Sequence, residues 1–135
     1  MNGTKGQNLI LSLFITLDFV WSKIKENRLQ KKAVFIDEAW QLIGARSNEM
    51  AAEYVKEIFK TIRAFGGSAF VMTQEINDFF SLNDGEYGKA IIGNSDTKIV
   101  LHLDEPDASM VQEIMGLSKE EHKKIKSLAK GNGLV

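Results

Sequence analysis

The stretch AVFIDEAW at residues 33–40 is a short apolar run that ends in two adjacent carboxylates, Asp37 and Glu38. Its uncharged, mostly β-favouring residues predict a buried strand, because a parallel strand covered on both faces is continuously hydrophobic rather than alternating. Such a strand carries Asp37 to the carboxyl edge of its sheet, where open α/β sheets bind their ligands. The stretch therefore predicts an α/β fold with a polar site at that edge.

An aspartate and a glutamate at this edge suit nucleotide hydrolysis. Asp37 can hold the water shell of Mg²⁺, and Glu38 can orient or deprotonate the water that attacks a γ-phosphate. The alternative is that the acidic pair only begins the next helix and favours its dipole. The sequence has no G-x-x-x-x-G-K-[ST] phosphate loop, since its one Gly-Lys pair, at 88–89, is followed by Ala90. We therefore expect part of an ATPase, severed at both ends, that begins after the phosphate-binding loop.

Composition and residue spacing exclude several classes of protein and several kinds of site. A chain of 135 residues with 44% hydrophobic content predicts one compact unit. The net charge of -1 argues against a globally basic nucleic-acid binder, and the absence of cysteine excludes disulfides and thiolate metal sites. No zinc site is expected, because neither His102 nor His122 has a partner at metal-ligand spacing. The apolar stretch at 9–21 contains Asp18 and is shorter than the roughly 20 residues of a membrane span.

Hydrophobic periodicity predicts alternating helices and strands. Helices are expected at 8–28, 50–65, 75–80, 86–92, 106–115 and 118–130, and strands at 33–37, 68–74 and 97–103. Residues 44–48 are turn-prone, Gly66-Gly67 is a helix-stop signal, and Ser118 with Glu121 has capping-box spacing. Residues 131–135 resemble a turn and the start of another strand. Alternation of this kind predicts βαβ crossovers and a mainly parallel sheet.

Three further polar residues are candidates for the site. Gln74 ends the second predicted strand, where it could sense a γ-phosphate and the attacking water or simply cap the following helix. Arg63 could reach a phosphate or a neighbouring subunit's nucleotide, or be an ordinary solvated residue. Asn94 could contact the nucleotide side of the sheet or cap a turn. The basic residues between 23 and 32 could contact DNA or form a solvated face.

Segments 34–42, 58–67, 71–74 and 91–99, in this order and spacing, resemble the conjugative type IV secretion ATPases. These are the TraC/TraE-like members of the FtsK/HerA branch of RecA-like P-loop motors. The likeness extends over about residues 8–135. It implies a partial ATPase domain at 1–135: a three-layer α/β RecA-like core, with helices on both faces of the sheet and the phosphate-loop strand missing.

The resemblance also implies roles for the candidate residues. Asp37 would be the Walker B residue that holds Mg²⁺ through water, Glu38 the catalytic glutamate and Gln74 the glutamine motif. Arg63 would act on a nucleotide in the same or an adjacent subunit, and Asn94 would lie near the nucleotide. ATP and Mg²⁺ are the expected cofactors of the full-length protein. This segment alone would bind neither and would be inactive.

The resemblance implies a ring-forming motor, a hexamer in the full-length protein, at the cytoplasmic face of a secretion channel. The implied partners are other copies of the chain, channel components and DNA, and the implied work is DNA or protein transfer or pilus assembly. Two alternatives are a DNA translocase or coupling protein of the same branch, and a non-catalytic assembly module. Without its phosphate-loop strand the sheet would have a central gap, closed by re-pairing of strands or by strand edges of another copy.

Overall fold

The computed structural model describes residues 3–44 and 47–135, and the chain forms two compact units, Met1–Ile91 and Ile92–Val135. Composition predicted a single compact unit, whereas the structure divides the chain into these two. The assignment of 1–135 to one ATPase domain stays a prediction. The predicted turn at 44–48 lies partly outside the described residues.

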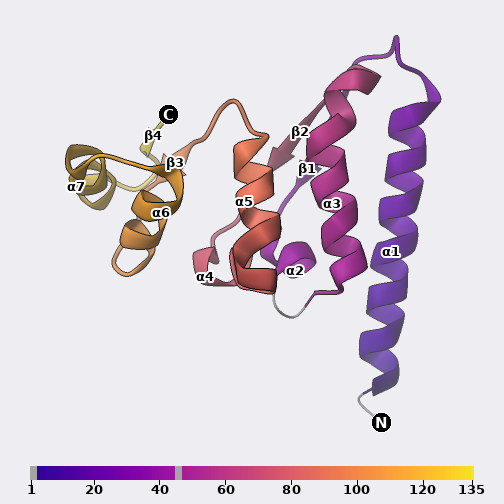
Figure 1. The fold of residues 1–135 in the computed structure, drawn as a ribbon, viewed down its shortest axis with the longest axis horizontal. Coiled ribbons are helices and arrows are strands. Elements are labelled where there is room, and N and C mark those ends of the chain that lie inside the picture. The colour runs from indigo at the N-terminus through magenta and orange to yellow at the C-terminus, as the bar shows by residue number, and fades with distance from the viewer. Residues whose placement is uncertain (1–2, 45–46) are drawn as a thin grey trace. The chain divides into compact units, whose positions relative to one another are not determined.

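The first unit alternates helices with two strands, as the periodicity predicted (Figure 1). Its elements are α1 (Gly3–Glu26), β1 (Lys32–Ile36), α2 (Trp40–Ile43), α3 (Glu49–Thr61), the 3₁₀ helix η1 (Ile62–Phe65), β2 (Gly67–Val71), α4 (Ile76–Phe79), the 3₁₀ helix η2 (Leu82–Gly85) and α5 (Glu86–Gly93). The helices expected at 8–28, 50–65, 75–80 and 86–92 are confirmed. Both strands end earlier than predicted, one residue earlier in β1 and three in β2.

The two strands form a parallel pair, with Lys32 opposite Gly67 and Ile36 opposite Val71. Parallel pairing brings the carboxyl ends of both strands to one edge, as the crossover pattern predicted. One face of the pair packs through Val34 on a buried cluster contributed by α1, α3 and η1: Ile24, Ile58 and Ile62. Burial of this cluster is the main source of stability for the pair.

The other face of the pair is open, which corrects the prediction of a strand covered on both faces. Phe35 is 65% exposed and stacks on Phe70, with the ring centroids 4.6 Å apart. Residues of β1 alternate between the two faces, and the apolar run concealed this alternation because both faces carry apolar side chains. Nothing in the composition of the run distinguishes the covered face from the open one.

The chain reversal before β2 depends on glycine. Gly66 has a φ of 73°, in the left-handed region, and a Cβ there would lie 2.6 Å from the carbonyl oxygen of Arg28. Only glycine fits both requirements without strain. The predicted helix-stop signal is therefore confirmed at this residue.

Local contacts engage the basic residues around the end of α1. Lys23 forms an ion pair of 2.8 Å with Glu26, and the guanidinium of Arg28 lies 4.7 Å from the ring centre of Phe65. Lys32 donates a hydrogen bond of 3.0 Å to the carbonyl oxygen of Phe65. These contacts agree with a solvated and partly structural role, and contact with DNA stays a prediction.

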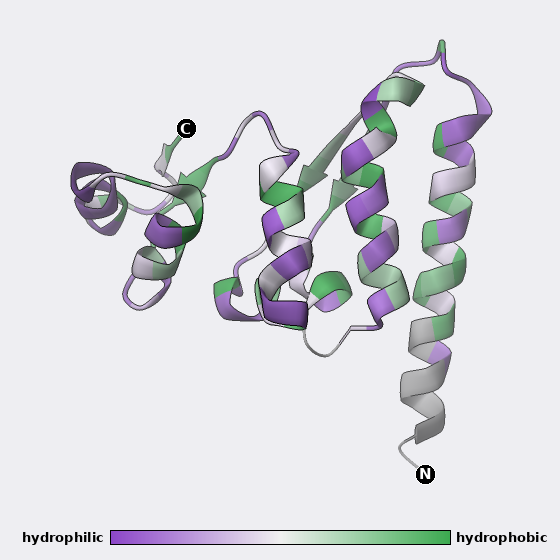
Figure 2. Cartoon of the chain, in the orientation of Figure 1, coloured by the Kyte–Doolittle hydropathy of each residue, from purple (hydrophilic) through white to green (hydrophobic). Residues whose placement is uncertain are grey.

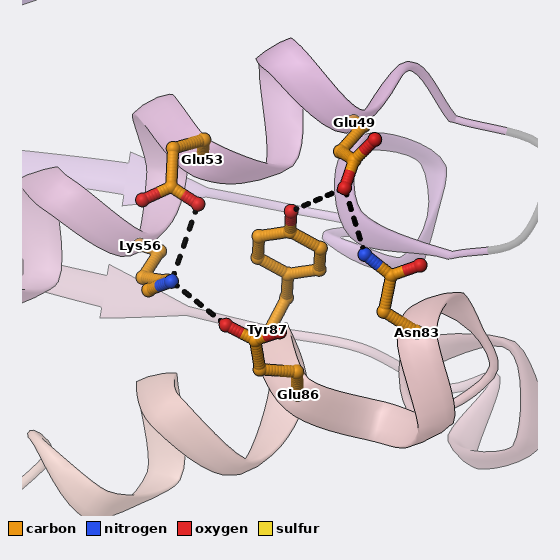
Figure 3. Close-up of polar contacts among 6 residues, drawn as sticks. All are labelled: Glu49, Glu53, Lys56, Asn83, Glu86 and Tyr87. Carbon is orange, nitrogen blue, oxygen red and sulfur yellow. Dashed lines mark hydrogen bonds and ion pairs between the residues drawn. The ribbon is translucent and has the colours of Figure 1, made fainter.

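A group of polar contacts fastens α3 to η2 and α5 (Figure 3). It consists of Glu49, Glu53, Lys56, Asn83, Glu86 and Tyr87. Lys56 lies 2.9 Å from Glu86 and 3.2 Å from Glu53, and its hydrogen bond with Glu86 is the main cause of a raised Lys56 pKa. Glu49 accepts from the amide of Asn83 at 2.9 Å and from the Tyr87 hydroxyl at 3.4 Å. These bonds hold the segment after α4 in place.

The second unit contains β3 (Val100–Leu101), α6 (Asp107–Met115), α7 (Lys119–Ser127) and β4 (Gly133–Leu134). Its core includes Ala108, Val111 and Ile125. Figure 2 shows α7 as mostly hydrophilic, which fits a surface helix that buries Ile125 alone of its residues. The capping box of Ser118 and Glu121 is confirmed, and both of its hydrogen bonds form.

The strand predicted at 97–103 is shorter than expected. Only two of its residues form β3, which pairs antiparallel with β4 and makes no ladder with β1 or β2. How the gap in the sheet would be closed, by re-pairing of strands or by strand edges of another copy, stays a prediction.

The lengths and compositions of the helices can be compared with those of a membrane span in the part of the chain that the structure describes. None of the helices there combines the length and the apolar content that crossing a bilayer requires.

Candidate functional site

Backbone hydrogen bonds extend the pairing of β1 and β2 beyond the regular strands. The amide of Met72 donates to the carbonyl oxygen of Ile36 at 2.9 Å, and the amide of Ala39 donates to the carbonyl oxygen of Met72 at 3.0 Å. Asp37 and Glu38 lie between these two attachment points. The acidic pair is therefore fixed at both ends against the segment that follows β2.

The backbone of Glu38 adopts an unusual conformation at this point. Its φ is 50°, in the left-handed region, which costs a residue with a side chain about 1–3 kcal/mol. Its amide donates to Oδ1 of Asp37 at 2.9 Å, and its carbonyl oxygen accepts from the amide of Gln41 at 2.9 Å. These bonds hold a sharp turn between β1 and α2.

Both carboxylate oxygens of Glu38 accept hydrogen bonds. The side-chain amide of Gln74 donates to Oε1, and the indole N–H of Trp40 donates to Oε2 at 2.6 Å. Gln74 lies beyond the end of β2, so this contact joins the ends of the two parallel strands. The sequence predicted that residues 38 and 74 would lie together, and the structure confirms their proximity.

Asp37 suits the water shell of Mg²⁺. Its carboxylate is exposed at the carboxyl edge of the sheet, and one of its oxygens already accepts the Glu38 amide. Mg²⁺ keeps several waters and is usually bound through one or two carboxylates together with substrate phosphates. No group of three acidic, histidine or cysteine residues that could enclose a metal occurs in the described ranges. One exposed carboxylate beside a nucleotide is consistent with this mode of binding.

The structure does not bring Arg63 to this group, and the place of Asn94 relative to the group stays a prediction. Arg63 lies in η1, at the amino end of β2, whereas Glu38 and Gln74 lie beyond the carboxyl ends of the strands. A strand of five residues separates these edges by roughly 15 Å. Asn94 directly follows α5 and belongs to the second unit. Asp37, Glu38 and Gln74 are therefore the site residues that meet.

Trp40 is the residue of this site that sequence reasoning missed. Its indole is only partly exposed and has a single donor, which usually finds an acceptor when it is covered. A tryptophan two residues after a carboxylate was a signal for such a bond. The left-handed backbone of Glu38, which makes the bond reachable, had no signal in the sequence.

The chain is similar to several known proteins. A family model described as the TraG P-loop domain matches residues 5–134. Protein TraC of Escherichia coli (strain K12) is 32% identical over an alignment of 96 residues, and the match covers 67% of this chain and 11% of TraC. The solved structure of VirB4 of Thermoanaerobacter pseudethanolicus superimposes with a TM-score of 0.81 at 28% identity, over 93% of this chain and 33% of that one.

These matches confirm the predicted fold class, a partial RecA-like α/β core, and the predicted resemblance to the type IV secretion ATPases. The chain spans about a tenth of TraC and a third of the VirB4 chain. The family match covers nearly all of the chain, including both strand ends that carry the site. The chain belongs to the TraG P-loop domain family.

Proposed function

We propose that this chain supplies the hydrolytic carboxylates of an ATP-hydrolysing motor in a conjugative type IV secretion system. The observation that carries the proposal is the convergence of Asp37, Glu38 and Gln74 at the ends of two parallel strands. The likeness to TraC and VirB4 supports the same class of protein. The phosphate cradle would belong to another part of a longer chain, and the 135 residues alone would be inactive.

Each residue of the site has a distinct task in this proposal. Asp37 would hold a Mg²⁺ ion through water, and such an ion would supply positive charge to offset the charge that develops on the phosphates. Glu38 orients the attacking water and accepts its proton. Gln74 donates to Glu38 in this structure and has a second amide proton for a phosphate oxygen or the water.

Arg63 and Asn94 have less direct tasks. Because Arg63 lies at the opposite edge of the strand pair, we propose that it acts on the nucleotide of an adjacent subunit rather than on its own. A ring of subunits, expected to be a hexamer, would place such an arginine at a neighbour's site. Asn94 would contact the nucleotide from the second unit.

The partners and location follow from the same proposal. The motor would act at the cytoplasmic face of the membrane, together with components of the secretion channel, and would drive DNA or protein transfer or pilus assembly. DNA is a further candidate partner of the full-length protein.

A turnover assay tests the proposal. Release of phosphate from Mg·ATP is compared between the 135-residue chain and the longer natural protein that contains it. Turnover is expected only in the longer protein, and Asp37→Asn in that protein should raise the Mg²⁺ concentration required for half-maximal rate. Robust hydrolysis by the 135-residue chain, or an unchanged Mg²⁺ requirement in Asp37→Asn, would refute it.

Two alternative functions would give different results in the turnover assay. A DNA translocase or coupling protein of the same branch would have turnover that rises strongly when DNA is added. A non-catalytic assembly module, in which the acidic pair only begins α2, would leave the nucleotide chemistry of the longer protein unaffected by changes at Asp37 or Glu38.

A further inference from the structure

We propose that Trp40 is a positioning residue for Glu38, holding the carboxylate in its reactive orientation while Gln74 is engaged elsewhere. This inference rests on the proposed function. It starts from the contact between the Trp40 indole N–H and Oε2 of Glu38, which is 2.6 Å long. A charge-assisted hydrogen bond of this length is among the stronger ones in proteins.

The backbone of Trp40 lies in a tightly packed helix. It begins α2, where the neighbouring Ala39 and the later Ile43 are both fully buried. Gly44 ends this helix with its amide 2.7 Å from the Trp40 carbonyl oxygen. A Cβ at Gly44 would lie 2.7 Å from the carbonyl oxygen of Asp78, so α2 sits tightly against α4. The backbone that carries the indole is therefore held within a tightly packed helix.

The chemistry of the indole suits a holding role. It has one N–H donor, no acceptor and no charge change in the physiological range, so it neither takes a proton from the attacking water nor loses its own. A carboxylate oxygen has two lone-pair positions, and an oxygen that accepts one N–H can still accept a proton from water. Trp40 can thus orient Glu38 without blocking its function as a base.

The two donors of Glu38 differ in what they could do when a nucleotide binds. Gln74 comes from the segment after β2, and a contact that turns its bonded N–H toward a phosphate or water would take that donor from Oε1. Trp40 lies within the same turn as Glu38 and can keep Oε2 throughout. Without this second bond, the flexible glutamate side chain would have no fixed orientation at the moment of hydrolysis.

The first experiment uses the 135-residue chain and needs no activity. Tryptophan is labelled with ¹⁵N, and the two indole N–H signals are assigned with Trp21→Phe. The Trp40 signal should lie downfield of an exposed indole and should exchange slowly with solvent. Glu38→Ala should move it to the free-indole position, whereas Glu57→Ala, on the exposed side of α3, should leave it in place. A Trp40 signal that does not respond to Glu38→Ala would overturn the inference.

The second experiment measures kcat and KM of the longer protein. Trp40→Phe keeps an aromatic ring but removes the donor, and it should lower kcat roughly tenfold or more with KM for ATP unchanged. Trp21→Phe, whose ring packs on Phe65, is the matched control and should keep kcat.

The outcomes separate this inference from the proposed function. If Glu38→Gln abolishes turnover but Trp40→Phe leaves kcat unaltered, Trp40 has no positioning role and the inference alone fails. If Glu38→Gln has no effect on turnover, the proposed function fails, and the labelled indole signals still report whether the contact exists. Should Trp40→Phe not fold, the Glu38→Ala spectrum decides the contact without it.

Discussion

The left-handed backbone at Glu38 gives a prediction that depends on this local geometry alone. Glu38→Gly and Glu38→Ala remove the same carboxylate and the same two hydrogen bonds to Trp40 and Gln74. They differ in the backbone, because alanine must adopt the φ of 50° with a Cβ and glycine need not. We expect the glycine variant to have the larger free energy of unfolding.

The size of the difference follows from two opposing effects. The left-handed conformation costs an L-residue about 1–2 kcal/mol, which glycine does not incur. Glycine loses more conformational freedom on folding, which favours alanine by about 0.4–1 kcal/mol. The strain is the larger effect, and Glu38→Gly should exceed Glu38→Ala in stability by about 1 kcal/mol. With a urea slope of about 1–3 kcal/mol per molar, the midpoints differ by roughly 0.3–1 M.

Urea unfolding followed by tryptophan fluorescence measures this difference. Both tryptophans, Trp21 and Trp40, lie in the first unit, so the signal reports the unit that contains residue 38. The matched control is Glu57, an exposed residue inside α3, where glycine should be about 1 kcal/mol less stable than alanine. The sign of the glycine effect should thus reverse between the two positions. If Glu38→Ala were as stable as Glu38→Gly, the backbone at residue 38 would not be strained.

Three further predictions concern packing and charge. Gly44→Ala should lower the unfolding free energy of the first unit, because the new Cβ would meet backbone oxygens 2.5 and 2.7 Å away. The same change should speed the exchange of the Trp40 indole N–H with solvent. Urea titration measures the first effect and the ¹⁵N-labelled spectrum the second. Ile58→Ala should cost about 2–5 kcal/mol, because Ile58 is fully buried in the core beneath the sheet; the same titration measures it. Hydrogen bonds from Ser109, the larger cause, and from Lys126 lower the Glu105 pKa from 4.5 to about 2. A lowered carboxyl pKa stabilises the fold above pH 4.5, and this contribution should vanish as the pH falls from 4.5 to 2. Amide exchange in α6 measures it, and Glu105→Gln should abolish the dependence.

The sequence was sufficient for the parts of the fold that local patterns encode. The apolar runs before Asp37 and Gln74 predicted the two strands and their shared edge, and the capping residues around Ser118 predicted the start of α7. Parallel pairing then made the meeting of residues 38 and 74 a consequence of topology. These features need only periodicity and chain direction.

Other features depend on tertiary context that no local pattern records. The run that forms β1 is apolar on both faces, so it could not reveal that the Phe35 side is open. The sequence predicted the start of a strand within 131–135, but nothing in so short a segment indicated that it would pair antiparallel with β3. The left-handed backbone of Glu38 arises from the attachment of Ala39 to Met72 and not from a turn-forming residue.

The central claim is that Glu38 is the base of an ATP-hydrolysing site, and one substitution tests it directly. Glu38→Gln in the longer protein keeps the size of the side chain and removes its charge. ATP binding with Mg²⁺ should persist while turnover falls by about 10²–10⁴-fold, and Glu57→Gln should retain the original rate. Turnover in Glu38→Gln equal to that of the unmodified protein would contradict the account.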